Sequence, residues 1–104
     1  MPTITLSLTG TFILATLESY PSTPSNNSIQ RLDAPGTVNL PVDSGSNAIY
    51  AVVNALPGSA WTITATQGGA ACQIVCNGQQ GASYAGGSGA AVTLVVFPPA
   101  VSQL

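Results

Sequence analysis

Charge is what this sequence lacks most. Four of its 104 residues are charged at neutral pH, and it contains no lysine and no histidine. Those four are Glu18, Arg31, Asp33 and Asp43, or 4% of the chain, where an ordinary soluble domain has about 25%. Binding to a nucleic-acid backbone or to an anionic membrane surface needs several Lys or Arg side chains. A single arginine excludes both kinds of partner.

Groups that carry catalysis or bind metal are equally scarce. Glu18, Asp33 and Asp43 are the only carboxylates, and without His or Lys few agents for general acid–base chemistry are left. The segment DSGSN at 43–47 has oxygen ligands spaced loosely as in a calcium loop, but it lacks the further acidic groups such a site uses. We therefore expect no enzymatic activity, no cofactor and no metal site.

The two cysteines, Cys72 and Cys76, stand four residues apart in ACQIVC. On a regular strand their Cα atoms would be roughly 13 Å apart, whereas a disulfide needs them within about 7 Å. A sharp bend could bring them together, and thiolates pooled across a symmetry axis could hold zinc, which needs four ligands. We predict instead two free thiols buried as small apolar groups, which fits assembly in a reducing cytoplasm.

No apolar run reaches the ~20 residues that a membrane-spanning helix requires. The N-terminal stretch MPTITLSLTG has no basic residue and alternates between polar and apolar side chains, unlike a secretory signal. We expect neither a membrane span nor a signal peptide.

Apolar and polar residues alternate with a period of two along most of the chain. TITLSL, TVNLPV, AWTITAT and AAVTLVVF each place Ile, Leu, Val or Trp on one face and mostly Thr, Ser or Asn on the other, as half-buried strands do. Glycine- and proline-rich turns separate these runs. The pattern predicts one all-β domain over 1–104: a two-sheet antiparallel β-sandwich, jelly-roll-like, with about seven to eight strands. A polar loop is expected at 19–28 and an extended C-terminal arm at 98–104.

Two segments, TFILATL at 11–17 and AIYAVVNAL at 48–56, are apolar on both faces. A strand of this kind is covered either by a loop or by another subunit, and the loops here are short and polar. We therefore expect a subunit to cover them. The candidate intersubunit contacts are Phe12, Ile13, Leu14, Leu17 and Tyr50.

Aromatic side chains are the other candidates for binding. Trp61 lies in an alternating run and is predicted to belong to the core, whereas Tyr20 and Tyr84 are close to expected loops. Stacking of a sugar on an aromatic ring, with Asp43 or Asn47 as polar partners, would make the chain a small carbohydrate-binding module or lectin.

The middle of the chain resembles the β-sandwich modules of bacteriophage virions. In that pattern a Thr-x-x-Leu-Pro strand precedes an apolar strand ending near Asn, followed by a Thr-Ile-Thr strand, an Ile-x-x-x-Gly turn and a Gly-rich turn before Val-Thr-Leu. The matching positions are Thr37, Leu40, Pro41, Asn54, Thr62, Ile63, Thr64, Ile74, Gly78, Gly86, Gly87, Val92, Thr93 and Leu94. Residues 1–35 do not follow it. The resemblance implies a structural role and a homo-oligomer, usually a trimer.

Resemblance and composition together predict a structural virion protein that is assembled in the host cytoplasm. It would be a capsid decoration or cement protein, or a fibre-associated subunit. Its partners would be the major capsid protein or other virion proteins, bound through apolar and β-edge contacts. The alternatives are the carbohydrate-binding module and a subunit of a surface layer or filament.

Overall fold

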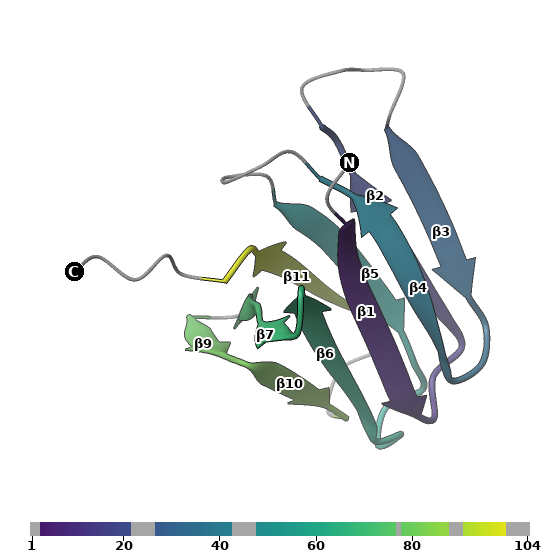
Figure 1. Cartoon of the computed structure of the whole chain (residues 1–104). Coiled ribbons are helices and arrows are strands. Elements are labelled where there is room, and N and C mark those ends of the chain that lie inside the picture. Colours follow the sequence, from purple (N-terminus) through teal and green to yellow (C-terminus); the bar gives the residue numbers. More distant parts are fainter. Residues whose placement is uncertain (1–2, 22–26, 43–47, 77, 88–90, 100–104) are drawn as a thin grey trace.

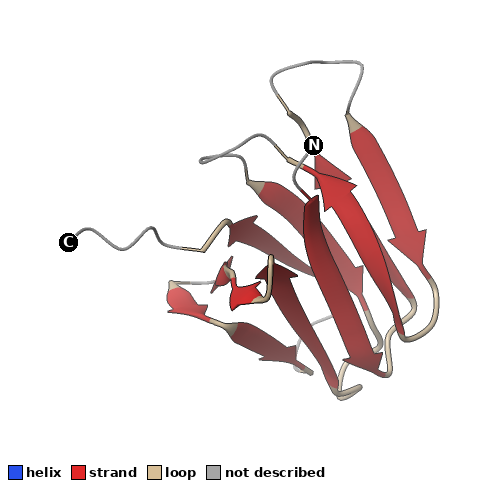
Figure 2. Ribbon diagram, in the orientation of Figure 1, coloured by secondary structure: helices blue, strands red, loops and turns tan. Residues whose placement is uncertain are grey.

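The computed structural model describes residues 3–21, 27–42, 48–76, 78–87 and 91–99, and within them the chain forms strands and turns but no helix (Figure 2). The described residues therefore contain no helix that could cross a membrane. The strands are β1 (Thr3–Gly10), β2 (Leu14–Ser19), β3 (Ser28–Leu32), β4 (Gly36–Pro41), β5 (Ile49–Asn54), β6 (Trp61–Gln67), β7 (Ala70–Ala71), β8 (Gln73–Cys76), β9 (Gln79–Gly81), β10 (Ser83–Gly86) and β11 (Ala91–Phe97).

These strands form two antiparallel sheets packed face to face (Figure 1). Sheet A has the order β10-β6-β1-β4, with β7 also paired to β6, and sheet B has the order β3-β2-β5-β11-β8-β9. All pairings are antiparallel. The predicted all-β sandwich is confirmed.

The core lies between the sheets. It is formed by the apolar side chains that occupy every second position of the strands and point inward. Ile4, Leu6 and Leu8 of β1 lie opposite Leu17 of β2 and Leu94 of β11 in one continuous buried cluster. Burying a side chain of this size stabilises the fold by about 1.5–3 kcal/mol. The period of two in the sequence is therefore the physical origin of both sheets.

The chain crosses from sheet A to sheet B at residues 11–13. Gly10 has φ 94°, and a Cβ on it would overlap the carbonyl oxygen of Ala60 and lie 2.7 Å from the Cα of Trp61, so glycine is required where β1 ends. Two backbone hydrogen bonds fix the crossing: Thr11 N–H donates to Ala60 O at 2.8 Å and Ile13 N–H to Asn54 O at 2.7 Å.

This crossing corrects two of the expected intersubunit contacts. Phe12 is turned between the sheets and Leu17 lies on the inward phase of β2, and the two side chains are 9% and 0% exposed. Both belong to the core of this chain and present no surface to a neighbour. The segment 11–17 is apolar on both sides because it contains two different elements. Residues 11–13 cross between the sheets, and residues 14–17 begin the half-buried strand β2.

Eleven strands are present in the described residues, more than the seven or eight predicted, in part because the chain twice bends from one sheet to the other within a short run of residues. The chain leaves β7 in sheet A for β8 in sheet B at Cys72, and leaves β9 in sheet B for β10 in sheet A at Ala82. The strand order also differs from a jelly roll, in which the first and last strands are neighbours. Here β1 lies in sheet A and β11 in sheet B.

The expected loop and arm have different bounds in the structure. Ser19 is the last residue of β2 and Ser28 the first of β3, so the connection covers 20–27, of which 22–26 lie outside the described residues. Pro98 and Pro99 follow β11 without joining a strand, and residues 100–104 of the expected arm lie outside the described residues.

Cys72 and Cys76 are free and buried, as predicted. The Cys76 thiol approaches the carbonyl oxygen of Thr93 at 3.5 Å, and burial raises the pKa of the Cys72 thiol. A protonated thiol with no solvent access is a poor nucleophile.

We therefore expect neither thiol of the native protein to react with an excess of a thiol reagent such as Ellman's reagent within minutes at pH 8, and both to react once the chain is unfolded in denaturant. Spectrophotometric titration measures this directly. Rapid labelling of the native protein at either position would contradict the burial described here.

Candidate interaction surface

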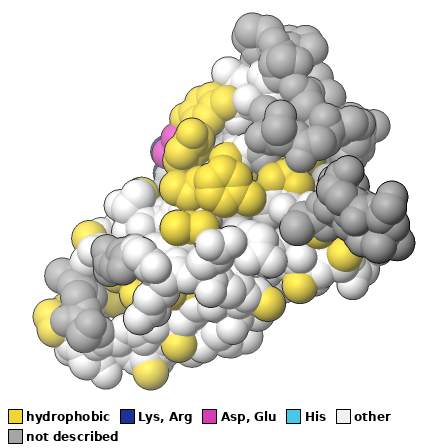
Figure 3. Space-filling view, turned by 90° about the vertical axis from the view of Figure 1, so that its left-hand side faces the viewer, with side chains coloured by type: hydrophobic (Ala, Val, Ile, Leu, Met, Phe, Trp, Pro, Cys, Tyr) yellow, Lys and Arg dark blue, Asp and Glu magenta, His cyan; other side chains and the backbone are white. Residues whose placement is uncertain are grey.

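The outer face of sheet B carries an apolar band. Its members are Tyr20, Ile29, Tyr50, Val52, Val75, Val95 and Phe97. Four of them are large side chains left about half exposed: Tyr20 at 43%, Ile29 at 48%, Tyr50 at 47% and Phe97 at 42%. From the side, hydrophobic side chains gather into a patch with an acidic side chain at its border (Figure 3).

Strand register aligns this band across the sheet. Ile29 pairs with Glu18, Glu18 with Tyr50, Tyr50 with Val95, and Val95 with Val75. We call this line, which crosses β3, β2, β5, β11 and β8, the Tyr50 row.

A second line runs beside it, one step of two residues further along the strands. It contains Arg31, Thr16, Val52 and Thr93 of β3, β2, β5 and β11, and we call it the Val52 row. The two rows lie roughly 6.7 Å apart at the usual rise of a strand. Together they make the outer face of sheet B apolar along its centre and polar mainly toward β2 and β3.

Tyr20, Tyr50 and Glu18 form a cluster within the band. The Tyr20 and Tyr50 rings lie 6.2 Å apart between centroids at 52°, a favourable tilted contact for aromatic pairs. The Tyr20 hydroxyl donates a hydrogen bond to a carboxylate oxygen of Glu18. That bond, followed by desolvation and the charge of Glu18, raises the pKa of Tyr20. Tyr20 therefore remains a neutral donor that positions the Glu18 carboxylate.

The outer face of sheet B also carries one charge of each sign. Glu18 is on β2 in the Tyr50 row, and Arg31 is on the neighbouring edge strand β3 in the Val52 row. Arg31 is exposed and forms no ion pair with a described carboxylate. The face is electrically neutral overall, with its two charges side by side.

The expected contact residues fall in three places. Tyr50 is in the band, and Leu14 is half-buried at the end of β2 on the same outer face. Ile13 is 55% exposed but lies on the crossing between the sheets, and Phe12 and Leu17 are in the core. The sequence did not single out Ile29, Val75, Val95 or Phe97, although the run VTLVVF shows apolar residues in both phases of a strand.

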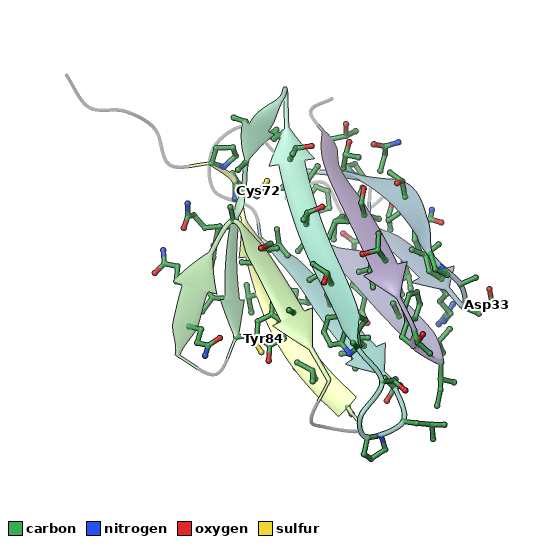
Figure 4. The ribbon with its side chains drawn as sticks, turned by 90° about the horizontal axis from the view of Figure 1, so that it is seen from below. Asp33, Cys72 and Tyr84 are labelled. Carbon is green, nitrogen blue, oxygen red and sulfur yellow. The ribbon has the colours of Figure 1, made fainter. Side chains whose placement is uncertain are left out.

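The outer face of sheet A has a different character. Its outward residues on β1, β4, β6 and β10 are mainly hydroxyl side chains without charge, and oxygen-tipped side chains project from β1 and β6 in Figure 4. Cross-strand hydrogen bonds join Thr5 to Asn39 at 2.5 Å and Ser7 to Thr37 at 3.0 Å. The polar side chains of this face form hydrogen bonds with one another and with water. It is therefore the solvent-facing side of the sandwich.

The aromatic carbohydrate-binding candidates divide between the core and the surface. Trp61 is 2% exposed, as predicted for a core residue, and Tyr84 reaches between the sheets to place its ring centroid 5.7 Å from that of Trp61 (Figure 4). Asp43 and Asn47 lie outside the described residues. Tyr20, together with Tyr50, remains as an exposed aromatic platform.

The two described carboxylates lie on different elements of the fold. Glu18 is on β2, whereas Asp33 is at the turn between β3 and β4 (Figure 4). Across the described residues, no set of three His, Cys, Asp or Glu side chains is close enough to hold a metal ion. The calcium-like segment at 43–47 lies outside that part of the chain.

No protein-family model, no curated protein sequence and no solved structure matches this chain. The resemblance to bacteriophage virion modules remains a prediction from the sequence, and the outer face of sheet B is the basis for a functional proposal.

Proposed function

We propose that this chain is a non-catalytic structural subunit of a virion, of the capsid decoration, cement or fibre-associated kind. The observation that carries the proposal is the apolar band on a sandwich whose core is already complete. Apolar patches of this kind on a folded domain mark interaction surfaces. Burial of this band against neighbouring protein is the function that the face supports best.

Composition supports the same role. A chain with 4% charged residues has little electrostatic repulsion to keep copies apart, which suits a protein held permanently among neighbours. Binding at joints between capsid proteins would stabilise the assembled shell by mass action, because only the assembled state offers the complete site. The partners we propose are the major capsid protein or other virion proteins together with further copies of this chain. Buried free thiols suit assembly in the host cytoplasm.

A carbohydrate-binding module is the second candidate, and the Tyr20–Tyr50 pair is the observation that favours it. The exposed, tilted rings could stack on a sugar, and the neighbouring Glu18 carboxylate could accept hydrogen bonds from the sugar hydroxyls. The absence of any change in tyrosine fluorescence on titration with a panel of sugars would remove this candidate.

Sedimentation of virus particles tests the structural role. We expect the tagged chain to sediment with particles in a density gradient, and the variant Tyr50→Ser/Val95→Thr to remain at the top because its band no longer excludes water. Thr64→Ser, on the outer face of sheet A, is the matched control and should sediment like the original chain. Quantitative immunodetection across the gradient measures this, and an original chain found only in the soluble fractions would overturn the proposal.

A further inference from the structure

We infer that the apolar band is covered by a second copy of this chain, in a two-fold pair held at one side by two Glu18–Arg31 ion pairs. This inference deepens the assembly role proposed above and rests on it. It names the occupant of the outer face of sheet B and leaves the sheet edges for other proteins.

Strand register defines how two such faces fit. If the two-fold axis crosses the strands midway between the Tyr50 row and the Val52 row, each strand faces its own counterpart running the opposite way. The Tyr50 row of one copy then lies over the Val52 row of the other. Sheets stacked in this way are separated by about 10 Å, with their side chains interdigitated.

The ends of the band also find partners in this arrangement. Tyr20 and Phe97 lie one step before the Tyr50 row, on the side away from the Val52 row. The symmetry places them over the positions one step beyond the partner's Val52 row, which are Leu14 and Ala91. Large exposed rings thus meet a half-buried Leu and a small Ala, and the aromatic surface is removed from water.

The charges make the face complementary to itself. Glu18 faces Thr16 of the second copy, and the adjoining residue on the next strand of that copy is Arg31, about 5 Å to the side at normal strand spacing. The usual rotation of about 30° between packed sheets shifts this position by about 5 Å, within the reach of Glu and Arg side chains. The same pair recurs by symmetry, so both charges of the face, the half-buried Glu18 and the exposed Arg31, acquire an opposite charge.

The area is sufficient for a pair. Five strands about 4.8 Å apart and six residues of about 3.3 Å each cover about 500 Å² on each copy. The pair therefore buries about 1,000 Å² in total, counted as flat area without the projecting side chains. This total reaches the lower limit for a specific interface. Interfaces near this lower limit are typical of weak or transient complexes.

Charge reversal tests the pairing in the intact chain. We expect the original protein at about 100 μM to have the mass of a dimer by sedimentation equilibrium. Glu18→Arg and Arg31→Glu should each weaken dimerisation about 100-fold, since like charges then face each other twice. Asp33→Arg makes the same change of charge as Glu18→Arg at a turn away from the band, and it should leave the dimer intact. Circular dichroism checks that each variant is folded.

Mixing Glu18→Arg with Arg31→Glu provides the decisive measurement. In a mixed pair, the arginine introduced at position 18 of one chain would face the glutamate introduced at position 31 of the other. The unchanged Arg31 of the first chain would face the unchanged Glu18 of the second, so both contacts have opposite signs. Dimer should form in the equimolar mixture at concentrations at which each variant alone is mainly monomeric. Contacts within one chain cannot produce this rescue.

A monomeric or trimeric original protein, dimerisation unaffected by either reversal, or a mixture that remains monomeric would overturn the inference. A dimer that shows the rescue but never sediments with particles would leave the pairing intact and overturn the proposed virion role. The two failures are therefore distinguishable.

Discussion

Replacing Gly86 with Ala is expected to destabilise the protein by about 3 kcal/mol, at the upper end of the range for overpacked cores. A Cβ at this position would overlap Cζ2 and Cε2 of Trp61 and lie 2.7 Å from its Nε1. Trp61 cannot move away easily because it is buried and the Tyr84 ring packs against it. For a chain of this length the loss corresponds to a fall in Tm of roughly 12–24 °C, measurable by calorimetry.

The neighbouring glycine gives a matched control. A Cβ on Gly87 would meet its nearest atom, the carbonyl oxygen of Ser59, at an ordinary 3.4 Å, so Gly87→Ala should change Tm by only a few degrees. The Trp61→Phe substitution frees room for the new methyl group and removes an indole N–H that has no hydrogen-bond partner among the described residues. The double variant Gly86→Ala/Trp61→Phe should therefore be more stable than the sum of the two single effects predicts. Strict additivity would contradict a direct clash.

Leu17→Ala is expected to cost about 3 kcal/mol, within the range for a fully buried leucine. Its side chain is 0% exposed in the core, and its removal leaves a cavity between the sheets. Leu56→Ala makes the same chemical change at a side chain that is 64% exposed and should alter stability by less than about 0.5 kcal/mol. Urea unfolding monitored by Trp fluorescence measures both.

This comparison also separates a core role from an interface role for Leu17. If Leu17 contacted another subunit, its truncation would change the oligomer mass while leaving the stability of the monomer unaltered. The expected result is the reverse: a loss of stability that does not depend on protein concentration.

The fold was accessible from the sequence because its physical cause is local. A strand with Ile4, Leu6 and Leu8 on one side and Thr or Ser on the other has one way to hide its apolar face, which is to pack it against another sheet. Both cysteines are free, as predicted, although the chain turns from β7 to β8 at Cys72 and does not continue as the single strand that the prediction assumed. Trp61 was placed in the core by the phase of its alternating run.

The candidate surface was only partly accessible, because it depends on which strands become neighbours. Phe12 was misplaced because period-two reasoning assumes a continuous strand, whereas the chain turns between sheets at that point. Tyr50 was found, since its strand is apolar in both phases. Ile29 and Phe97 were missed because they join Tyr50 only through pairings of β3 and β11 with strands distant in sequence.

The hydroxyl side chains on the outer face of sheet A decide how far association can proceed. A pair that buries both apolar faces leaves mainly threonine and serine side chains on its two broad outer faces, and these bind water in preference to a third molecule. Self-association would therefore stop at the dimer, and the dimer would resist aggregation without the charged surface residues that most soluble proteins have. A chain with so few charges would in this way remain dispersed as a pair.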